Sequence, residues 1–328
     1  MKKGKLVSLL SLLIIVSLIA SGCGKTESKS ASGENTYYIG ISQLVEHPAL
    51  DDARRGFEDG LKELGVNAKI DYQNATGEIP NTVSIAEKFK KDNVDLIYAI
   101  ATPAAQSAKQ VTSDIPVLFS AVTDPVKSQI VNKWEDVGDN VTGTSDKAPI
   151  ESQLKMFKQI DDSIKKIGIL YSTSEANSEI QIDEVKKLAP NEDLDVVTVG
   201  VNNVNEIPQA IDSLLSKVDA IYTPSDNLIA SSIELVSTKL IEKQMISVSA
   251  EGAHVNNGTL LTNGLNYYEL GKQTAEMAKE ILVDGKSPSE IPVGIAEKTI
   301  TTVNIDTLEK LGLDKNLDIF KDAKKVEK

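Results

Sequence analysis

Hydroxyl groups and acids stand singly in this chain, directly after short apolar runs. The hydroxyls are Thr102, Thr123, Ser145 and Ser174, and the acids are Asp124, Asp146, Glu175 and Asp226. Hydroxyls and the backbone N–H groups at helix starts bind carboxylates, whereas single acids bind ammonium groups. The pattern suits a small molecule that carries both charges, such as a free amino acid.

Catalytic chemistry has few candidates in this sequence. The chain has two histidines, His47 and His254, and a single cysteine, Cys23, with no motif that links them to a nucleophile. Metal-ligand spacing and a Gly-rich phosphate loop are also missing. We therefore predict a protein that is not an enzyme and needs no metal or cofactor.

The stretch YTPSDN (222–227) resembles ATPAAQ (101–106), since both follow an apolar run and share a Thr-Pro step. The later copy adds Ser225, Asp226 and Asn227, and we predict that these three touch a ligand. Asp226 would then pair with the ammonium group of an amino acid. The alternative is that Asp226 only caps a helix, because Asp is a preferred N-cap residue.

Short apolar runs alternate with segments of helical period from residue 37 onward, which predicts an α/β fold with parallel sheets. KKIGILYS (165–172) repeats the pattern of YYIGIS (37–42), and VDAIYTP (218–224) repeats that of VDLIYAI (94–100). This internal repeat predicts two similar lobes, each a parallel sheet flanked by helices. Ligands of such sheets bind beyond the carboxyl ends of the strands, where the polar residues above occur.

The chain is expected to cross between the lobes about three times, near residues 147, 263 and 292. Lobe 1 would comprise 37–146 plus 264–291, and lobe 2 would comprise 147–263 plus 292–328. Several crossings restrict the lobes to a hinge motion that closes on a small molecule.

The N-terminus has the pattern of an export signal. Three lysines precede an apolar run that is too short to span a membrane, and small residues lead to Cys23. We predict a signal peptide over 1–22, lipid attachment at Cys23 and a flexible tether over 23–36, which places the body on the extracytoplasmic face of the membrane. A plain secreted protein with a stray cysteine is the alternative.

The formal charge of −13 argues against a nucleic-acid partner, which needs clustered basic residues. We expect a monomer whose surface charge favours solubility.

Several motifs in order, EHPALDDARRGF, ATPAAQ, IPVLFSAVTDPV, NVTGTSD, SEANS and YTPSDNLIASS, closely resemble bacterial ABC transporter substrate-binding lipoproteins of the tryptophan-binding type. The resemblance covers most of residues 37–310. It implies a two-lobed type I periplasmic-binding-protein fold, a tyrosine or tryptophan ligand, and delivery to an ABC permease with its ATPase.

The resemblance also implies which side chains line the cleft. On the first-lobe side and hinge they are Thr102, Ala105, Gln106, Thr123, Asp124, Ser145 and Asp146. On the second-lobe side they are Ser174, Glu175, Asn177, Ser178, Asp226, Asn227 and Glu251. An aromatic ligand also needs an apolar slot, for which we predict Leu44, Glu46 and His47, although His47 could simply flank a helix. Ser225 stands where the family usually has threonine, which leaves the choice among aromatic ligands open.

Two alternatives share the same fold. One is a surface adhesin or sensor lipoprotein that retains the cleft and contacts a host surface. The other is a sugar- or nucleoside-binding protein, which the low aromatic content of 4% makes the weaker reading.

Overall fold

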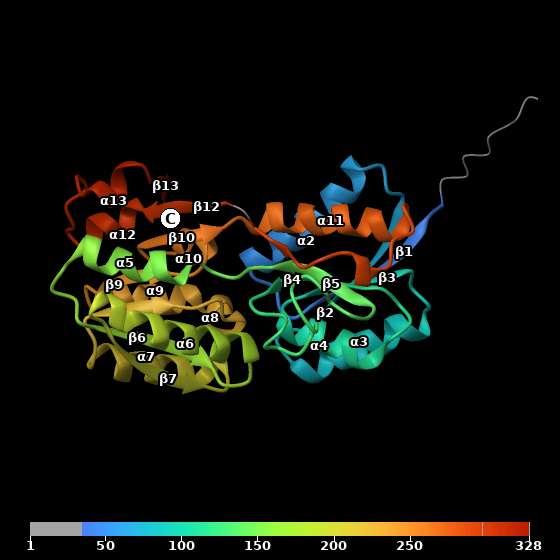
Figure 1. Cartoon of the computed structure of the whole chain (residues 1–328). Coiled ribbons are helices and arrows are strands. Elements are labelled where there is room, and N and C mark those ends of the chain that lie inside the picture. The colour runs from blue at the N-terminus through green and yellow to red at the C-terminus, as the bar shows by residue number, and fades with distance from the viewer. Residues whose placement is uncertain (1–34, 297, 328) are drawn as a thin grey trace, which may run out of the picture. The chain divides into compact units, whose positions relative to one another are not determined.

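Two separate sheets organise the computed structural model, which describes residues 35–296 and 298–327 (Figure 1). The predicted signal peptide, Cys23 and nearly all of the tether lie outside the described residues. By its contacts, the chain from Thr36 onward forms one compact unit that contains both sheets. No helix within the described ranges is both long and apolar enough to cross a lipid bilayer.

The first sheet has the strand order β11-β5-β4-β3-β1-β2. Its strands are β1 (Tyr37–Gln43), β2 (Ala68–Asn74), β3 (Leu96–Ile100), β4 (Val117–Val122), β5 (Val141–Ser145) and β11 (Gly294–Ile295). Helices α2 (Pro48–Glu63) and α11 (Tyr267–Leu282) cover one face, and α3 (Ile79–Lys91) and α4 (Thr102–Val111) cover the other. β3 is buried along its whole length, as its continuous apolar run LIYAI requires of a strand covered on both faces.

The second sheet has the order β13-β12-β10-β9-β8-β6-β7. Its strands are β6 (Lys166–Ser172), β7 (Asp195–Val201), β8 (Ala220–Thr223), β9 (Ile246–Ser249), β10 (Leu261–Leu265), β12 (Thr299–Asn304) and β13 (Lys324–Val326). The helices of this lobe are α5 (Ile150–Ile160), α6 (Ala176–Leu188), α7 (Ile207–Leu215), α8 (Asn227–Ser231), α9 (Ile233–Glu242), α10 (Gly252–Asn256), α12 (Ile305–Lys310) and α13 (Asp318–Lys321).

The predicted internal repeat is confirmed by the order of the strands. Strands β2-β1-β3-β4-β5 of the first sheet correspond in order to β7-β6-β8-β9-β10 of the second. The matching sequences found in the chain, at β1 and β6 and at β3 and β8, therefore occupy equivalent places in the two lobes.

The boundaries of the lobes differ slightly from the predicted ones. β10 continues to Leu265, so 264–265 stay in the second lobe, and β11 pairs with β5, so 292–295 stay in the first. The second sheet is also not wholly parallel, because β12 runs antiparallel to β10. The antiparallel direction of β12 follows from the last crossing between the lobes. The chain reaches β12 directly from β11 of the first lobe, without a helix of the second lobe that would return it in the parallel direction.

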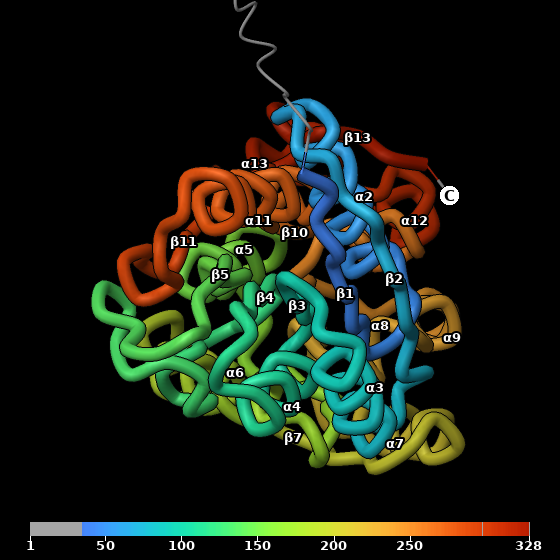
Figure 2. Tube along the Cα trace, turned by 90° about the vertical axis from the view of Figure 1, so that its right-hand side faces the viewer, coloured from blue at the N-terminus to red at the C-terminus, as the bar shows by residue number. Residues whose placement is uncertain are grey.

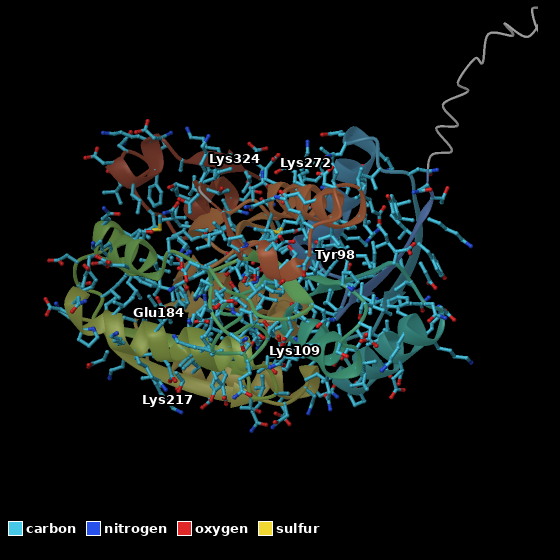
Figure 3. The ribbon with its side chains drawn as sticks, turned by 45° about the vertical axis from the view of Figure 1, so that its right-hand side comes forward. Tyr98, Lys109, Glu184, Lys217, Lys272 and Lys324 are labelled. Carbon is cyan, nitrogen blue, oxygen red and sulfur yellow. The ribbon has the colours of Figure 1, made fainter. Side chains whose placement is uncertain are left out.

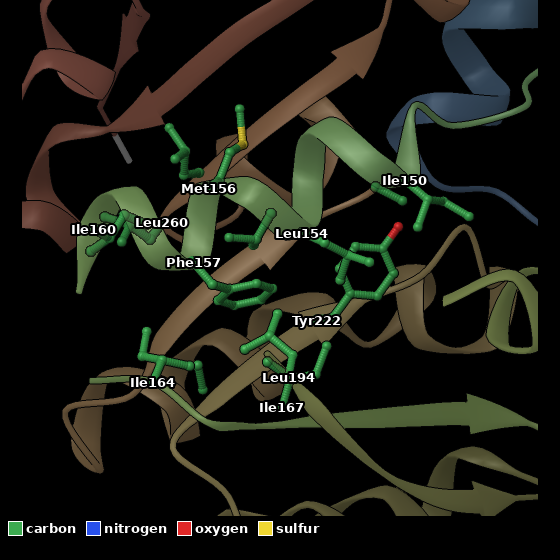
Figure 4. Packing of buried hydrophobic residues seen from close by; sticks show 14 of the residues in the cluster. Ile150, Leu154, Met156, Phe157, Ile160, Ile164, Ile167, Leu194, Tyr222 and Leu260 are labelled. Carbon is green, nitrogen blue, oxygen red and sulfur yellow. The ribbon is translucent and has the colours of Figure 1, made fainter. Parts of the chain in front are cut away.

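Among the described residues, the hydrophobic core comprises four clusters of buried side chains, one on each face of each sheet. Figure 4 shows one of them, in which Leu154 and Phe157 of α5 lie over Ile167 and Tyr222 of the second sheet. Burying one such side chain stabilises the fold by roughly 1.5–3 kcal/mol. The core therefore holds each lobe together independently of any ligand.

Helices α2 and α11 lie side by side, although more than 200 residues separate their starts (Figure 2). A methyl group at Gly56 would collide with the carbonyl oxygen of Tyr268, and one at Gly271 would collide with that of Ala53. Only glycine permits this close approach, which places the first residue of α11, Tyr267, between the lobes.

Candidate functional site

Helix starts from both lobes meet where the strands end. α4 of the first lobe contacts α6 of the second, and α2 contacts α10. The start of helix α8 lies at the same place, because Asn227, the first residue of α8, is hydrogen-bonded to His47, which precedes α2. Helix N-termini carry unpaired N–H groups and partial positive charge, so their convergence favours an anionic group.

Four acids nevertheless lie buried in this region. Asp146, Glu175, Asp226 and Glu251 are 4%, 5%, 0% and 3% exposed. Burial raises the pKa of each, that of Glu175 to about 7 and that of Glu251 well above its usual range. No lysine or arginine is among the described groups that act on these carboxyls. The cluster therefore attracts a positively charged group.

Lys217 and Lys324 are exposed at the surface, whereas the labelled tyrosine Tyr98 is buried in the first lobe (Figure 3). Lys324 lines a small pocket together with Gly252 and Tyr267.

Asp226 caps α8, as the alternative interpretation of YTPSDN stated. One carboxylate oxygen accepts from the backbone N–H of Ile229 at 2.9 Å. The other accepts from the N–H of Ser172 at 2.6 Å and from the hydroxyl of Ser178 at 2.7 Å. With three donors already in place, Asp226 joins β6, α6 and α8, and its contact with a ligand remains an untested prediction.

Glu175 is also occupied by donors of the second lobe. Its carboxylate accepts from the backbone N–H of Leu228 at 3.0 Å, from the amide of Asn177 at 3.2 Å, and from the side chain of Asn227. It thereby fixes the orientation of the Asn227 amide, whose NH₂ group must face the carboxylate.

That orientation determines the hydrogen bond between the lobes. The Asn227 oxygen lies 3.1 Å from Nε2 of His47 and accepts its proton. Nδ1 of the neutral His47 ring is then an acceptor, and it is buried without a partner among the described residues. Burial lowers the pKa of His47, which keeps the ring neutral.

Asp146 lies at the first crossing between the lobes and receives two hydroxyl donors. Tyr267 donates to it at 2.7 Å and Thr123 at 3.2 Å. The Tyr267 hydroxyl is also hydrogen-bonded to Glu251 of the second lobe, which lowers the pKa of Glu251 against the larger effect of burial. Sequence reasoning missed Tyr267, whose one local signal is the Asn266 cap before it.

Glu251 is the acid with the fewest donors. It stands at the N-cap position of α10, yet its carboxylate makes no capping bond, and its Oε2 atom has no described partner. Nε2 of His254 lies 3.7 Å from that oxygen and is likewise buried without one. The sequence predicted Glu251 only through the family resemblance and assigned His254 no role.

Unpartnered hydroxyls lie at the opposite, first-lobe side. The oxygens of Ser42, at the end of β1, and of Thr102, at the start of α4, are buried without described partners. Ala101 before α4 has φ 83° and ψ 155°, a conformation that normally needs glycine. Strain and unsatisfied donors together mark the N-terminus of α4 as a place for a carboxylate.

A cavity of about 400 Å³ opens between the lobes beside this cluster. Leu44, Ile79 and Pro80 line it from the first lobe, and Leu228 and Val204 from the second. The predicted residues Ser174, Glu175 and Asn227 border it too. Of the residues predicted for an apolar slot, Leu44 lines this cavity, whereas Glu46 and His47 line a different pocket, so the slot stays a prediction.

Other predicted residues hold local structure rather than meet in this cluster. Ala105 packs in the core behind α4, Gln106 donates to the Ser128 carbonyl, Asp124 accepts from the N–H groups of Val126 and Lys127, and Ser145 donates to the Thr123 carbonyl. Glu46 is exposed and accepts from Tyr72. Ser225 is the exception: its N–H donates to Gln181 and its carbonyl accepts from Asn177, but its side chain is hydrogen-bonded to Tyr267 of the cluster. Within the described residues no group of His, Cys, Asp and Glu is arranged to hold a metal ion.

Comparison with known proteins gives consistent results. Residues 38–327 match the family described as "ABC transporter substrate binding protein". The chain is 42% identical over 325 residues to the tyrosine-binding protein of Clostridioides difficile (strain R20291), which covers 96% of this chain and 94% of the relative.

Two solved structures are similar to this chain over most of its length. An ABC domain from Streptococcus pneumoniae in complex with L-Trp is 34% identical, covers 89% of this chain and 100% of that one, and has a TM-score of 0.85. The ligand-free, open structure of a substrate binding protein with adhesive properties from Clostridium difficile is 43% identical with coverage of 89% and 99%, yet its TM-score is 0.69.

Proposed function

The chain belongs to the ABC transporter substrate-binding proteins, and from this premise we propose that it captures a free aromatic amino acid between its lobes and delivers it to a membrane permease. The type I periplasmic-binding-protein fold predicted from the sequence is confirmed by its structural neighbours. Members of this family bind solutes outside the cytoplasm and are in general not enzymes.

The buried acids carry the proposal. Asp146 lies at the hinge and Glu251 in the second lobe, and the Tyr267 hydroxyl is hydrogen-bonded to both. No lysine or arginine is among the described groups that shift the pKa of either carboxyl. An ammonium group placed there would offset the cost of burying them. The ligand carboxylate would bind the unpartnered hydroxyls of Ser42 and Thr102 at the start of α4.

Asp226 has a different role in this arrangement from the one that the sequence suggested. Because its oxygens already accept three hydrogen bonds, we assign the ammonium to Asp146 and Glu251 and treat Asp226 as the support for α8.

The aromatic character of the ligand is supported by the relatives and by the cavity. One relative is named for tyrosine, and another is solved with L-Trp. The cavity of about 400 Å³ has the size of ordinary small-molecule sites, and Leu44 and Leu228 provide apolar surface for a ring.

A thermal-shift screen of the purified protein against the twenty amino acids tests the proposal. Tyrosine, tryptophan or phenylalanine should raise Tm, because ligand at 100 times Kd stabilises the folded state by about 2.7 kcal/mol. Stabilisation by a sugar or a nucleoside, with no response to any amino acid, would overturn it.

Membrane attachment through a lipid on Cys23 is part of the same proposal. A Cys23→Ala variant should be found in the culture medium, whereas the unaltered protein should stay with the membrane fraction. Equal partition of both proteins would exclude the anchor.

Adhesion is a second candidate function, favoured by the adhesive properties attributed to the Clostridium difficile relative. The outer faces of the lobes and the cleft are different surfaces, so both functions can coexist. Binding of host cells by the purified protein should then persist when the cleft is saturated with its amino acid.

A further inference from the structure

We propose that the ammonium group of the ligand and a proton compete for one place between Glu251 and His254, so that each binding event releases a proton. This inference rests on the proposed function, because it assumes an amino acid in the cleft. It concerns a coupling that neither the fold nor the family resemblance implies.

The two atoms that define this place face each other without a donor between them. Oε2 of Glu251 and Nε2 of His254 lie 3.7 Å apart, and both are buried without a described partner. This distance exceeds direct hydrogen-bond reach. Both side chains are almost completely buried, so bulk water does not satisfy them.

The hydrogen-bond network shows that Nε2 of His254 is an acceptor. Thr223 donates its hydroxyl proton to Ser249 at 2.8 Å. The Thr223 oxygen, 3.0 Å from Nδ1 of His254, must therefore accept the proton of Nδ1. A neutral imidazole with its proton on Nδ1 has a lone pair on Nε2.

If Glu251 were ionised, a lone pair of its Oε2 atom would therefore face the lone pair on Nε2 of His254. A hydrogen on either side would remove this repulsion between lone pairs, and two sources can supply it. One is a proton on Glu251, and the other is an N–H of a bound ammonium group. Both cannot occupy the place together.

The charged groups around Glu251 favour the proton when no ligand is bound. They are Asp146 at the end of β5, Glu175 before α6, Asp226 before α8, and Tyr267 on α11. His47, before α2, acts on His254. Burial and the three acids raise the pKa of Glu251 well above its usual range, while burial lowers that of His254 to about 3. Of the two groups, Glu251 is therefore the one favoured to carry a proton.

Ligand binding then exchanges one positive charge for another. The O–H bond of Glu251 breaks, its proton leaves to solvent, and the carboxylate accepts an N–H of the incoming ammonium. The net charge of the site is the same before and after the exchange. Affinity should fall by up to tenfold for each unit of decreasing pH, because the proton competes more strongly.

Titration calorimetry of the purified protein measures this release directly. The probe is the aromatic amino acid with the largest thermal shift, titrated at pH 6.5 and 7.5 in several buffers of different ionisation enthalpy. The observed enthalpy of ligand binding is plotted against the ionisation enthalpy of the buffer. Its slope should correspond to nearly one proton released for each ligand bound.

Two variants locate the source of that proton. Glu251→Gln should abolish the release and weaken binding at least about tenfold, since the ammonium group loses its charged partner. Glu184→Gln, which alters a half-buried acid paired with Lys147 outside the cleft, should keep the slope and the affinity of the unaltered protein. If Glu251→Gln does not fold, the slope of the unaltered protein and its pH dependence still decide the matter.

The outcomes separate the two proposals. Tight binding with no release of protons, or release that persists in Glu251→Gln, overturns the coupling and leaves the proposed function intact. Failure of every amino acid to bind overturns both.

Discussion

Removal of the Tyr267 hydroxyl tests whether the hinge and the acid cluster act together. The hydroxyl donates to Asp146 at 2.7 Å, and the side chain is 6% exposed. A hydrogen bond to a charged group contributes roughly 1.5–3 kcal/mol, and Tyr267→Phe leaves Asp146 with Thr123 as its one hydroxyl donor. The free energy of unfolding should therefore fall by that amount.

Binding should weaken in the same variant. The Tyr267 hydrogen bond lowers the pKa of Asp146 against the opposing effect of burial, so its loss raises that pKa further. Less of the carboxyl is then ionised, and we expect the affinity for the ligand to fall roughly tenfold, which corresponds to about 1.4 kcal/mol. Urea denaturation and titration calorimetry measure the two effects.

Tyr98→Phe is the matched control. Tyr98 is fully buried in the first lobe, and its hydroxyl bonds to the carbonyl of Ala53 at 3.3 Å, away from the acids. Its loss should cost about 1 kcal/mol of stability with unchanged affinity. The reasoning is refuted if Tyr267→Phe changes neither stability nor affinity, or if the control weakens binding equally.

Three further predictions concern single groups of the site. Asp226→Asn should lower the free energy of unfolding by roughly 1–3 kcal/mol in urea denaturation, because buried donors such as the Ser178 hydroxyl lose an acceptor; unchanged stability would contradict the capping role. Thr102→Val should leave stability within about 0.5 kcal/mol but weaken ligand binding about fivefold by calorimetry, since its hydroxyl has no described partner, and equal affinity would exclude that hydroxyl from the site. Burial lowers the pKa of His254 to about 3 and lowers that of His47 below its usual range, so nitrogen NMR at pH about 5.5 should find the His254 ring neutral with its proton on Nδ1, and His47 should titrate below a free histidine with its neutral proton on Nε2. The stability that the neutral rings contribute should be present above pH about 6.5 and decline as the pH falls. A protonated His254 ring at that pH of about 5.5 would refute the last prediction.

Much of the fold was predictable because its signals are local. Apolar runs such as LIYAI and the helical period that follows depend on residues close together in the chain. The internal repeat then predicted two lobes, and the strand orders confirm it. The antiparallel β12 was not predictable in this way, because its direction depends on which lobe the chain leaves last.

The candidate site was predicted less completely. The sequence identified Asp226 but left open whether it caps a helix or binds a ligand, and the donors that support the cap come from Ser172 and Ser178, about 50 residues away. Tyr267 and His254 were missed because neither belongs to a motif. They become part of the site only when α11 packs on α2 and α10 joins the second sheet.

The order of polar and apolar residues along this chain was enough to determine two similar α/β lobes and to place the polar side chains at the ends of strands. Only the tertiary structure decided which of those side chains still lack partners. A hydrogen bond depends on which groups from distant segments come within about 3 Å of one another. For this reason Asp226 is satisfied within the protein, whereas Glu251 and His254 face each other with no donor between them.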